Sequence, residues 1–96
     1  MEIRRRQYEM SRVLNIIEEK GWIEAERRVE GERITLSVRK DMKGLGAEER
    51  RLAIEELLTI VRVFGWSEES SRLDGVLAEV SIFKIVVSEA VGEVPE

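Results

Sequence analysis

The chain contains one stretch twice, and this duplication restricts the folds that it can adopt. Residues 14–40 (LNIIEEKGWIEAERRVEGERITLSVRK) align without a gap on residues 58–84 (LTIVRVFGWSEESSRLDGVLAEVSIFK), at a constant offset of 44 residues. Self-similarity at a fixed period indicates one structural unit that is used twice. Nine of the 27 aligned positions are identical, namely Leu14/Leu58, Ile16/Ile60, Gly21/Gly65, Trp22/Trp66, Glu24/Glu68, Arg28/Arg72, Gly31/Gly75, Ser37/Ser81 and Lys40/Lys84.

Each repeat is too short to bury a hydrophobic core of its own. The 96 residues therefore predict a single domain, 1–96, in which the two repeats share one core. We assign repeat 1 to about residues 3–40 and repeat 2 to about residues 47–88. A charged linker with two glycines joins them over residues 41–46, and an acidic tail follows over residues 89–96.

Each repeat begins with a helical pattern. Apolar residues recur at helical spacing from about Ile3 to Lys20 and again from about Ala47 to Phe64. A glycine follows each pattern, at Gly21 and at Gly65, where it is typical of a helix C-terminus. We therefore expect one amphipathic helix at the start of each repeat.

After each of these glycines the apolar period changes to two, which indicates a β-hairpin. Glu30-Gly31 and Asp74-Gly75 are the expected two-residue loops. The region 73–91 also fits a helical stripe, but the duplication and the β-branched run that ends it favour strand. With these loops, the residues expected to face the core are Ile23, Ala25, Val29, Ile34, Leu36 and Val38 in the first hairpin, and Val76, Ala78, Val80 and Ile82 in the second.

These elements predict an α+β, two-layer sandwich with the order αββαββ. Two helices would cover one face of a four-stranded antiparallel sheet, and a pseudo-two-fold axis would relate the repeats. The strand order stays open at this point.

Composition excludes several kinds of chemistry. The sequence has neither cysteine nor histidine, and so it lacks a thiol nucleophile, the commonest general base and the commonest transition-metal ligands. We expect no catalytic residue, metal or cofactor, and hence no enzyme. No apolar run is long enough to span a membrane, which predicts a soluble, cytoplasmic protein with no membrane partner. Dense Glu and Arg with few amides is typical of heat-adapted proteins, although a well-solvated surface gives the same composition.

The expected outward face of the second hairpin carries several apolar residues, where the first hairpin has mostly charged residues. A strand that is apolar on both sides must be covered on both sides, and both predicted helices are already used on the other face. We therefore expect a small non-enzymatic binding or assembly protein, a homodimer or higher oligomer joined through the outer sheet face or edge to edge through the last strand. The expected interface residues are Trp66, Leu77, Phe83, Ile85 and Val87.

Arginines of the first repeat suggest an alternative. A basic helix beside a basic two-stranded ribbon can follow a phosphate backbone, which would make this a nucleic-acid-binding protein. Interleaved glutamates on the same hairpin and a net charge of −4 weigh against this interpretation. The candidate contacts are Arg4, Arg5, Arg12, Arg28, Arg33 and Arg39.

A third hypothesis uses the duplicated polar and aromatic residues. With the expected loops, two tryptophans and two Glu–Ser pairs share the outer sheet face and could bind a flat cation. The residues are Trp22, Glu24, Ser37, Trp66, Glu68 and Ser81. The tryptophans also have a purely structural interpretation, in which each Gly-Trp corner packs a helix end over the sheet and Arg39 stacks on Trp22.

Overall fold

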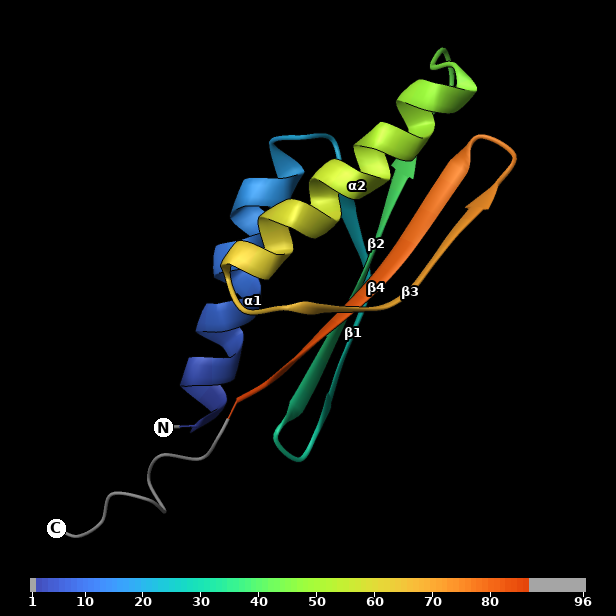
Figure 1. Ribbon diagram of the computed structural model, residues 1–96. Helices are drawn as coiled ribbons and strands as arrows, with labels where there is room; N and C mark the ends of the chain where they lie inside the picture. Colours follow the sequence, from blue (N-terminus) through green and yellow to red (C-terminus); the bar gives the residue numbers. More distant parts are fainter. Residues whose placement is uncertain (1, 87–96) are drawn as a thin grey trace, which may run out of the picture.

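A computed structural model describes residues 2–86 of the chain, with the side chains of residues 6–86 (Figure 1). The elements are α1 (Glu2–Glu18), β1 (Ile23–Glu30), β2 (Arg33–Asp41), α2 (Ala47–Val63), β3 (Ser67–Asp74) and β4 (Leu77–Ile85). The predicted α+β fold with the order αββαββ is therefore confirmed, and residues 73–85 belong to a hairpin rather than a helix. Val87 and the tail 89–96 lie outside the described residues.

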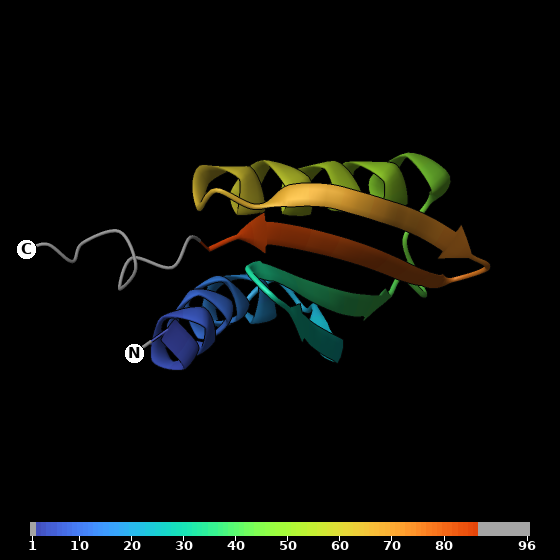
Figure 2. The same ribbon diagram turned by 90° about the horizontal axis from the view of Figure 1, so that it is seen from below.

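The four strands form one antiparallel sheet in the order β1-β2-β4-β3. Both helices lie on one face, with α1 beside β1 and α2 beside β3 (Figures 1 and 2). The two repeats meet where β2 pairs with β4 in the middle of the sheet. The last strand is therefore not an edge, and the expected edge-to-edge association through it is wrong.

The pairing of β2 with β4 locates the pseudo-two-fold axis. Ser37 pairs with Ser81, its own duplicate, and the side-chain oxygens of the two serines are 2.8 Å apart. Leu36 pairs with Ile82, which is the duplicate of Val38. The axis therefore passes between the two serines, and the repeats share one sheet and one core.

Both tryptophans belong to that core, each with only 1% of its surface exposed. Their predicted position on the outer sheet face is wrong, whereas the structural interpretation, a Gly-Trp corner at each helix end, is confirmed. The predicted stacking of Arg39 on Trp22 is not part of this corner, because Arg39 points to the outer face and pairs with Glu79. The buried apolar residues are Met10, Val13, Leu14, Ile17, Trp22, Ile34, Leu36, Val38, Met42, Leu57, Leu58, Val61, Trp66, Ala78, Val80, Ile82 and Val86.

The corner is the same in both repeats. The backbone N–H of Trp22 donates to the carbonyl of Ile17, and that of Trp66 donates to the carbonyl of Val61. This bond pattern requires a left-handed residue just before the tryptophan, and Gly21 has φ +95°. In each repeat, a lysine from the central strand closes the helix end.

These lysines are a duplicated pair. Lys40 donates from Nζ to the carbonyl of Lys20 at 2.7 Å, and Lys84 donates to the carbonyl of Phe64 at 2.9 Å. A cation at a helix C-terminus satisfies free carbonyls and interacts favourably with the helix dipole. Both repeats therefore have lysine at this position because each lysine binds the end of a helix.

The hairpin loops differ from the prediction by one residue. Glu30 pairs with Arg33 and Asp74 with Leu77, so the loops are residues 31–32 and 75–76. Each loop has a glycine with φ +64° at its first position, and no other residue type has a positive φ in the described chain. Glycine at the first position is the type II′ arrangement, whereas the predicted loops had glycine at the second position.

A β-bulge in each edge strand also departs from the predicted register. The ladder skips one residue between Glu24 and Glu26 in β1, and one between Glu68 and Ser70 in β3. An extra residue reverses the faces of the residues on one side of it. This reversal turns Trp22 and Trp66 toward the core.

The predicted core faces are confirmed for the central strands and wrong for the edge. Ile34, Leu36, Val38, Ala78, Val80 and Ile82 are fully buried. Ile23, by contrast, is 63% exposed because the bulge turns it outward, and Ala25 is the bulged residue. Val29 keeps the predicted face but is 48% exposed because β1 is an edge, and Val76 lies exposed in the second loop.

Candidate functional site

The outer face of the sheet, opposite the helices, is covered by no helix or strand among residues 2–86 (Figure 2). The paired rows of β2 and β4 alternate strictly, so that every second residue points to this face. The central outward residues are Arg33, Thr35, Ser37, Arg39 and Asp41 on β2, and Leu77, Glu79, Ser81, Phe83 and Ile85 on β4.

Two glutamates on this face each pair with two arginines. Glu69, the bulged residue of β3, lies 3.0 Å from Arg33 and 3.7 Å from Arg28. Glu79 lies 2.7 Å from Arg72 and 3.6 Å from Arg39. The candidate nucleic-acid contacts Arg28, Arg33 and Arg39 are therefore all engaged with carboxylates, which lowers the positive potential they offer to a phosphate.

The other candidate nucleic-acid contacts lie elsewhere. The Arg12 guanidinium sits over the Phe64 ring, 4.8 Å from its centroid, and so ties α1 to the end of α2. The side chains of Arg4 and Arg5 lie outside the described part of the chain. The structure thus does not gather the six arginines on one described surface.

The long side chains of this network shield the centre of the face. Thr35 is only 3% exposed and Ser37 only 7%, although they point away from the helices. Residues of the network also line a polar hollow of about 540 Å³, with the Ser37–Ser81 pair among its lining. The lining residues are Glu26, Arg28, Ser37, Glu69, Ser70, Ser71, Arg72, Glu79 and Ser81.

The apolar residues predicted for self-association are only partly brought together. Ile85 is 50% exposed, and Phe83, two residues before it on the same face, is half-buried. The Arg33 guanidinium stacks on the Phe83 ring at 4.0 Å from its centroid. Leu77 lies at the opposite end of β4. Trp66 is buried in the core, and Val87 lies outside the described residues.

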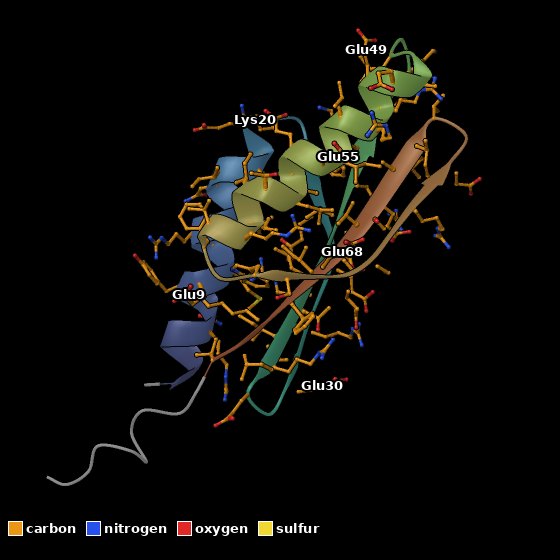
Figure 3. The ribbon with its side chains drawn as sticks, in the orientation of Figure 1. Glu9, Lys20, Glu30, Glu49, Glu55 and Glu68 are labelled. Atoms are coloured by element: carbon orange, nitrogen blue, oxygen red, sulfur yellow. The ribbon has the colours of Figure 1, made fainter. Side chains whose placement is uncertain are left out.

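The predicted ligand face is divided between the two sides of the sheet. Ser37 and Ser81 point outward, but the bulges place Glu24 opposite Val38, on the helix side. Glu68 is likewise opposite Ile82, on the helix side (Figure 3). With both tryptophans in the core, the six residues do not form one site.

Glu24 is instead half of a side-chain pair next to the bulge. Arg27 donates from Nε to one carboxylate oxygen of Glu24 and from a terminal nitrogen to the other, the second contact at 2.8 Å. These hydrogen bonds lower the pKa of Glu24, although partial desolvation opposes the effect. The same bonds raise the pKa of Arg27. In the second repeat, Glu68 accepts a hydrogen bond from the Ser71 hydroxyl instead.

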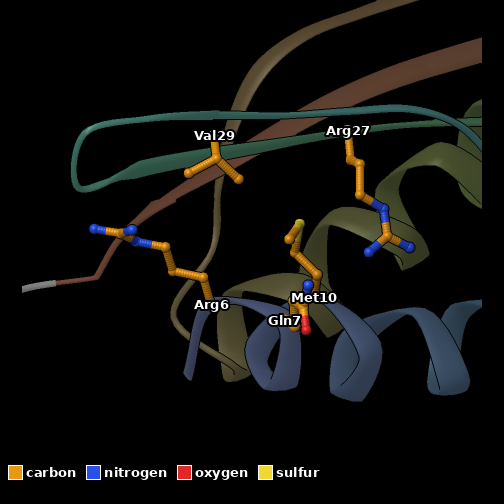
Figure 4. Close-up of a pocket in the computed structure, with 5 residues that line it drawn as sticks. All are labelled: Arg6, Gln7, Met10, Arg27 and Val29. Carbon is orange, nitrogen blue, oxygen red and sulfur yellow. The ribbon is translucent and has the colours of Figure 1, made fainter. Parts of the chain in front are cut away.

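A pocket that sequence reasoning missed opens between α1 and β1 (Figure 4). It has a volume of about 370 Å³ and is lined by Arg6, Gln7, Met10, Arg27 and Val29. Figure 4 shows Arg6 and Arg27 toward its two ends, with Met10 and Val29 between them. The Nε of Arg6 is buried and has no hydrogen-bond partner. The alternation of the sequence places Arg27 and Val29 on one face of a strand, but it does not show that this strand is an edge.

One part-buried ion pair joins three elements on the helix side. Glu9 of α1 (Figure 3) accepts a hydrogen bond at 2.8 Å from Lys84 of β4, which also binds the end of α2. The duplicate of Glu9 is Ala53, and Lys40, the duplicate of Lys84, binds a backbone carbonyl. This contact is therefore specific to one repeat.

Comparisons with protein families, with curated proteins and with solved structures give no match. Within residues 2–86, no helix is long and apolar enough to cross a membrane. In the same part of the chain, no cluster of three or more acidic side chains is arranged to hold a metal ion. Any functional conclusion therefore depends on the surfaces described above.

Proposed function

We propose that the protein is a small non-enzymatic binding protein that forms a two-fold homodimer through the outer face of its sheet. The observation that carries the proposal is the pair Phe83 and Ile85 on a sheet face that no described helix or strand covers. Apolar and aromatic residues beside arginine are enriched at the centres of protein interfaces. Association would give a helix–sheet–sheet–helix arrangement that buries both residues.

The charges of the face suit contact with a second copy. A two-fold interface brings the same patch of both copies together, so a patch with both signs can complement itself. Here Arg28 and Arg33 lie beside Glu69, while Arg39 and Arg72 lie beside Glu79. A specific interface needs about 800 Å² from each partner, an area that a face four strands wide can supply.

Light scattering at two protein concentrations tests the proposal. We expect a mass of twice 11.1 kDa for the natural chain, independent of concentration. Ile85→Asp places a charge in the interface and should yield monomer. The matched control is Val63→Asp, because Val63 is 78% exposed on α2, away from the outer face. A monomeric natural chain, or an Ile85→Asp variant that remains dimeric, would refute the dimer.

The polar hollow favours a second candidate, the binding of a small zwitterionic molecule. The duplicated pairs Arg28/Arg72 and Ser37/Ser81 all line it, together with carboxylates. Arg72→Gln should weaken such binding, whereas Arg62→Gln, on α2 outside the hollow, should not. Titration with free amino acids, followed by the amide NMR signals of Ser37 and Ser81, measures the binding to both variants and to the natural chain. Unshifted signals in the natural chain would exclude this candidate.

Nucleic-acid binding ranks below both proposals, because the described arginines of the first hairpin are paired with glutamates. Such a complex should weaken steeply as salt rises. Replacing Arg28 and Arg33 by glutamine should then flatten the salt dependence, and a binding curve that salt does not affect would exclude this function.

A further inference from the structure

We propose that the pocket between α1 and β1 binds an amphipathic monoanion, with its anionic head at Arg6 and its apolar body along Met10 and Val29. This site is separate from the outer sheet face, because all its residues lie on the helix side of the sheet or on α1. It does not depend on the oligomeric state of the protein.

The duplicate of Arg6 has acceptors that Arg6 lacks. Arg50 occupies the equivalent place on α2 and donates from Nε to the carbonyl of Leu45 at 2.9 Å. It also donates to the carbonyl of Gly75, in the loop of its own hairpin, at 3.2 Å. Arg50 thus has protein acceptors, whereas the buried Nε of Arg6 has none. A buried donor without an acceptor is unfavourable and rare, and an acceptor supplied by a ligand would satisfy it.

The charge of the pocket lining also favours an anion. Two of its five lining residues are arginines, and none is acidic. Arg27 is already held by both carboxylate oxygens of Glu24. Arg6 makes no ion pair with any residue that the structure describes. The uncompensated charge of the lining is therefore positive and lies at the Arg6 end.

The shape and polarity of the rest of the pocket suit an apolar chain. Met10 is buried beneath the pocket, and Val29 forms the opposite wall on the helix-facing side of β1 (Figure 4). The second repeat has Ile54 and the larger Leu73 at these positions. A volume of about 370 Å³ lies within the range of pockets that hold small ligands. An apolar chain with one carboxylate matches both ends of the site.

Decanoate is the probe, titrated into the full chain and followed by the NMR signals of the Arg6 Nε–H group and the Met10 methyl group. We expect both signals to shift in a saturable manner, with decanol and acetate binding at least roughly tenfold more weakly, since a charge-assisted hydrogen bond and apolar burial each contribute. Equal binding of decanol would overturn the anionic head. Decanoate shifts that centre on Ile85 instead would overturn the location.

Two variants test the same site without removing a core residue. Arg6→Gln should weaken decanoate binding roughly tenfold or more, and Val29→Leu should fill the pocket and weaken it too. Arg51→Gln is the matched control, because it removes one positive charge from an exposed position on α2. Unchanged affinity in Arg6→Gln, or an equal loss in Arg51→Gln, would show that no specific site exists.

Discussion

The two repeats have the same plan for their helix ends, loops and central strands, but they differ along their edges. The features that the repeats share are formed by identical residues. Gly21 and Gly65 end the helices, and Lys40 and Lys84 bind the carbonyls at those ends. The two serines form a hydrogen bond on the axis. Identity at the helix ends and on the axis therefore marks architecture. The α1–β1 pocket lies where the repeats differ.

The differences lie in the contacts of equivalent residues. Arg50 is bound to backbone carbonyls, whereas the Nε of Arg6 has no partner. Arg27 pairs with Glu24 where the second repeat has Ser71 with Glu68. Each difference changes the space between a helix and its edge strand. The first repeat keeps a pocket with arginines at both ends.

The largest expected effect tests the equivalence of the tryptophans. Both are fully buried at the same corner, so Trp22→Ala and Trp66→Ala should each lower the free energy of unfolding by about 3–5 kcal/mol. Urea unfolding measures both, with the exposed Tyr8→Ala as a control within about 0.5 kcal/mol of the natural chain. If the alanine variants do not fold, the phenylalanine variants provide the comparison. Costs that differ by more than about 2 kcal/mol would break the equivalence.

The two lysines should be unequal. Lys84→Met leaves the buried carboxylate of Glu9 without its cation and should cost about 2–3 kcal/mol. Lys40→Met removes only a contact to a backbone carbonyl and should cost about 1 kcal/mol. Chemical denaturation measures both. Adding Glu9→Gln to Lys84→Met should recover part of the loss, and a double variant as unstable as the sum of the single changes would contradict the pairing.

The serine pair on the axis should show a smaller, coupled effect. Ser37→Ala removes one partner of a part-buried hydrogen bond and should cost about 1 kcal/mol. Ser81→Ala should cost a similar amount because the axis makes the two positions equivalent. The double variant should cost less than the sum, since both changes remove the same bond. Strict additivity in a double-mutant cycle would show that the bond contributes nothing.

The element order could be predicted because it depends on local signals. The helical stripe of Met10, Val13 and Ile17 and the alternation of Ile34, Leu36 and Val38 are each visible within one element. Duplication then supplied the second half with stronger support than either half had alone. Strand order depends on pairing between distant segments, which no local pattern of one sequence contains.

The errors about the site have a single main physical cause. A bulge adds one residue that has no partner in the ladder. This residue is Ala25 in one repeat and Glu69 in the other, and neither residue type marks a bulge in the sequence. Since side chains alternate along a strand, that one residue moved Trp22 into the core and Glu24 to the helix side. The contacts of Glu69 depend on the bulge in β3, the pairing of Arg72 with Glu79 depends on the position of the loop, and the pairing of Arg39 with Glu79 depends on the strand order. The α1–β1 pocket depends on β1 being an edge.

The smallest expected effect concerns the pH dependence of the edge pair. Hydrogen bonds from Arg27 lower the pKa of Glu24 below its ordinary value of 4.5. A pKa that is lower in the folded chain stabilises the fold above the unfolded value, and this contribution is lost as the pH falls through the folded pKa. Arg27→Ser, which copies the second repeat, should move the NMR titration of Glu24 toward 4.5.

The accompanying change in stability should be small, because both side chains are partly exposed and solvent screens the pair. The difference in unfolding free energy between the natural chain and Arg27→Ser should be constant near neutral pH and should shrink in acid. Arg51→Ser, at an exposed position on α2, should leave the titration of Glu24 unchanged. If Glu24 titrates at the same pH with Arg27 and with serine, the pair does not hold the carboxylate, and the two edge strands are electrostatically alike.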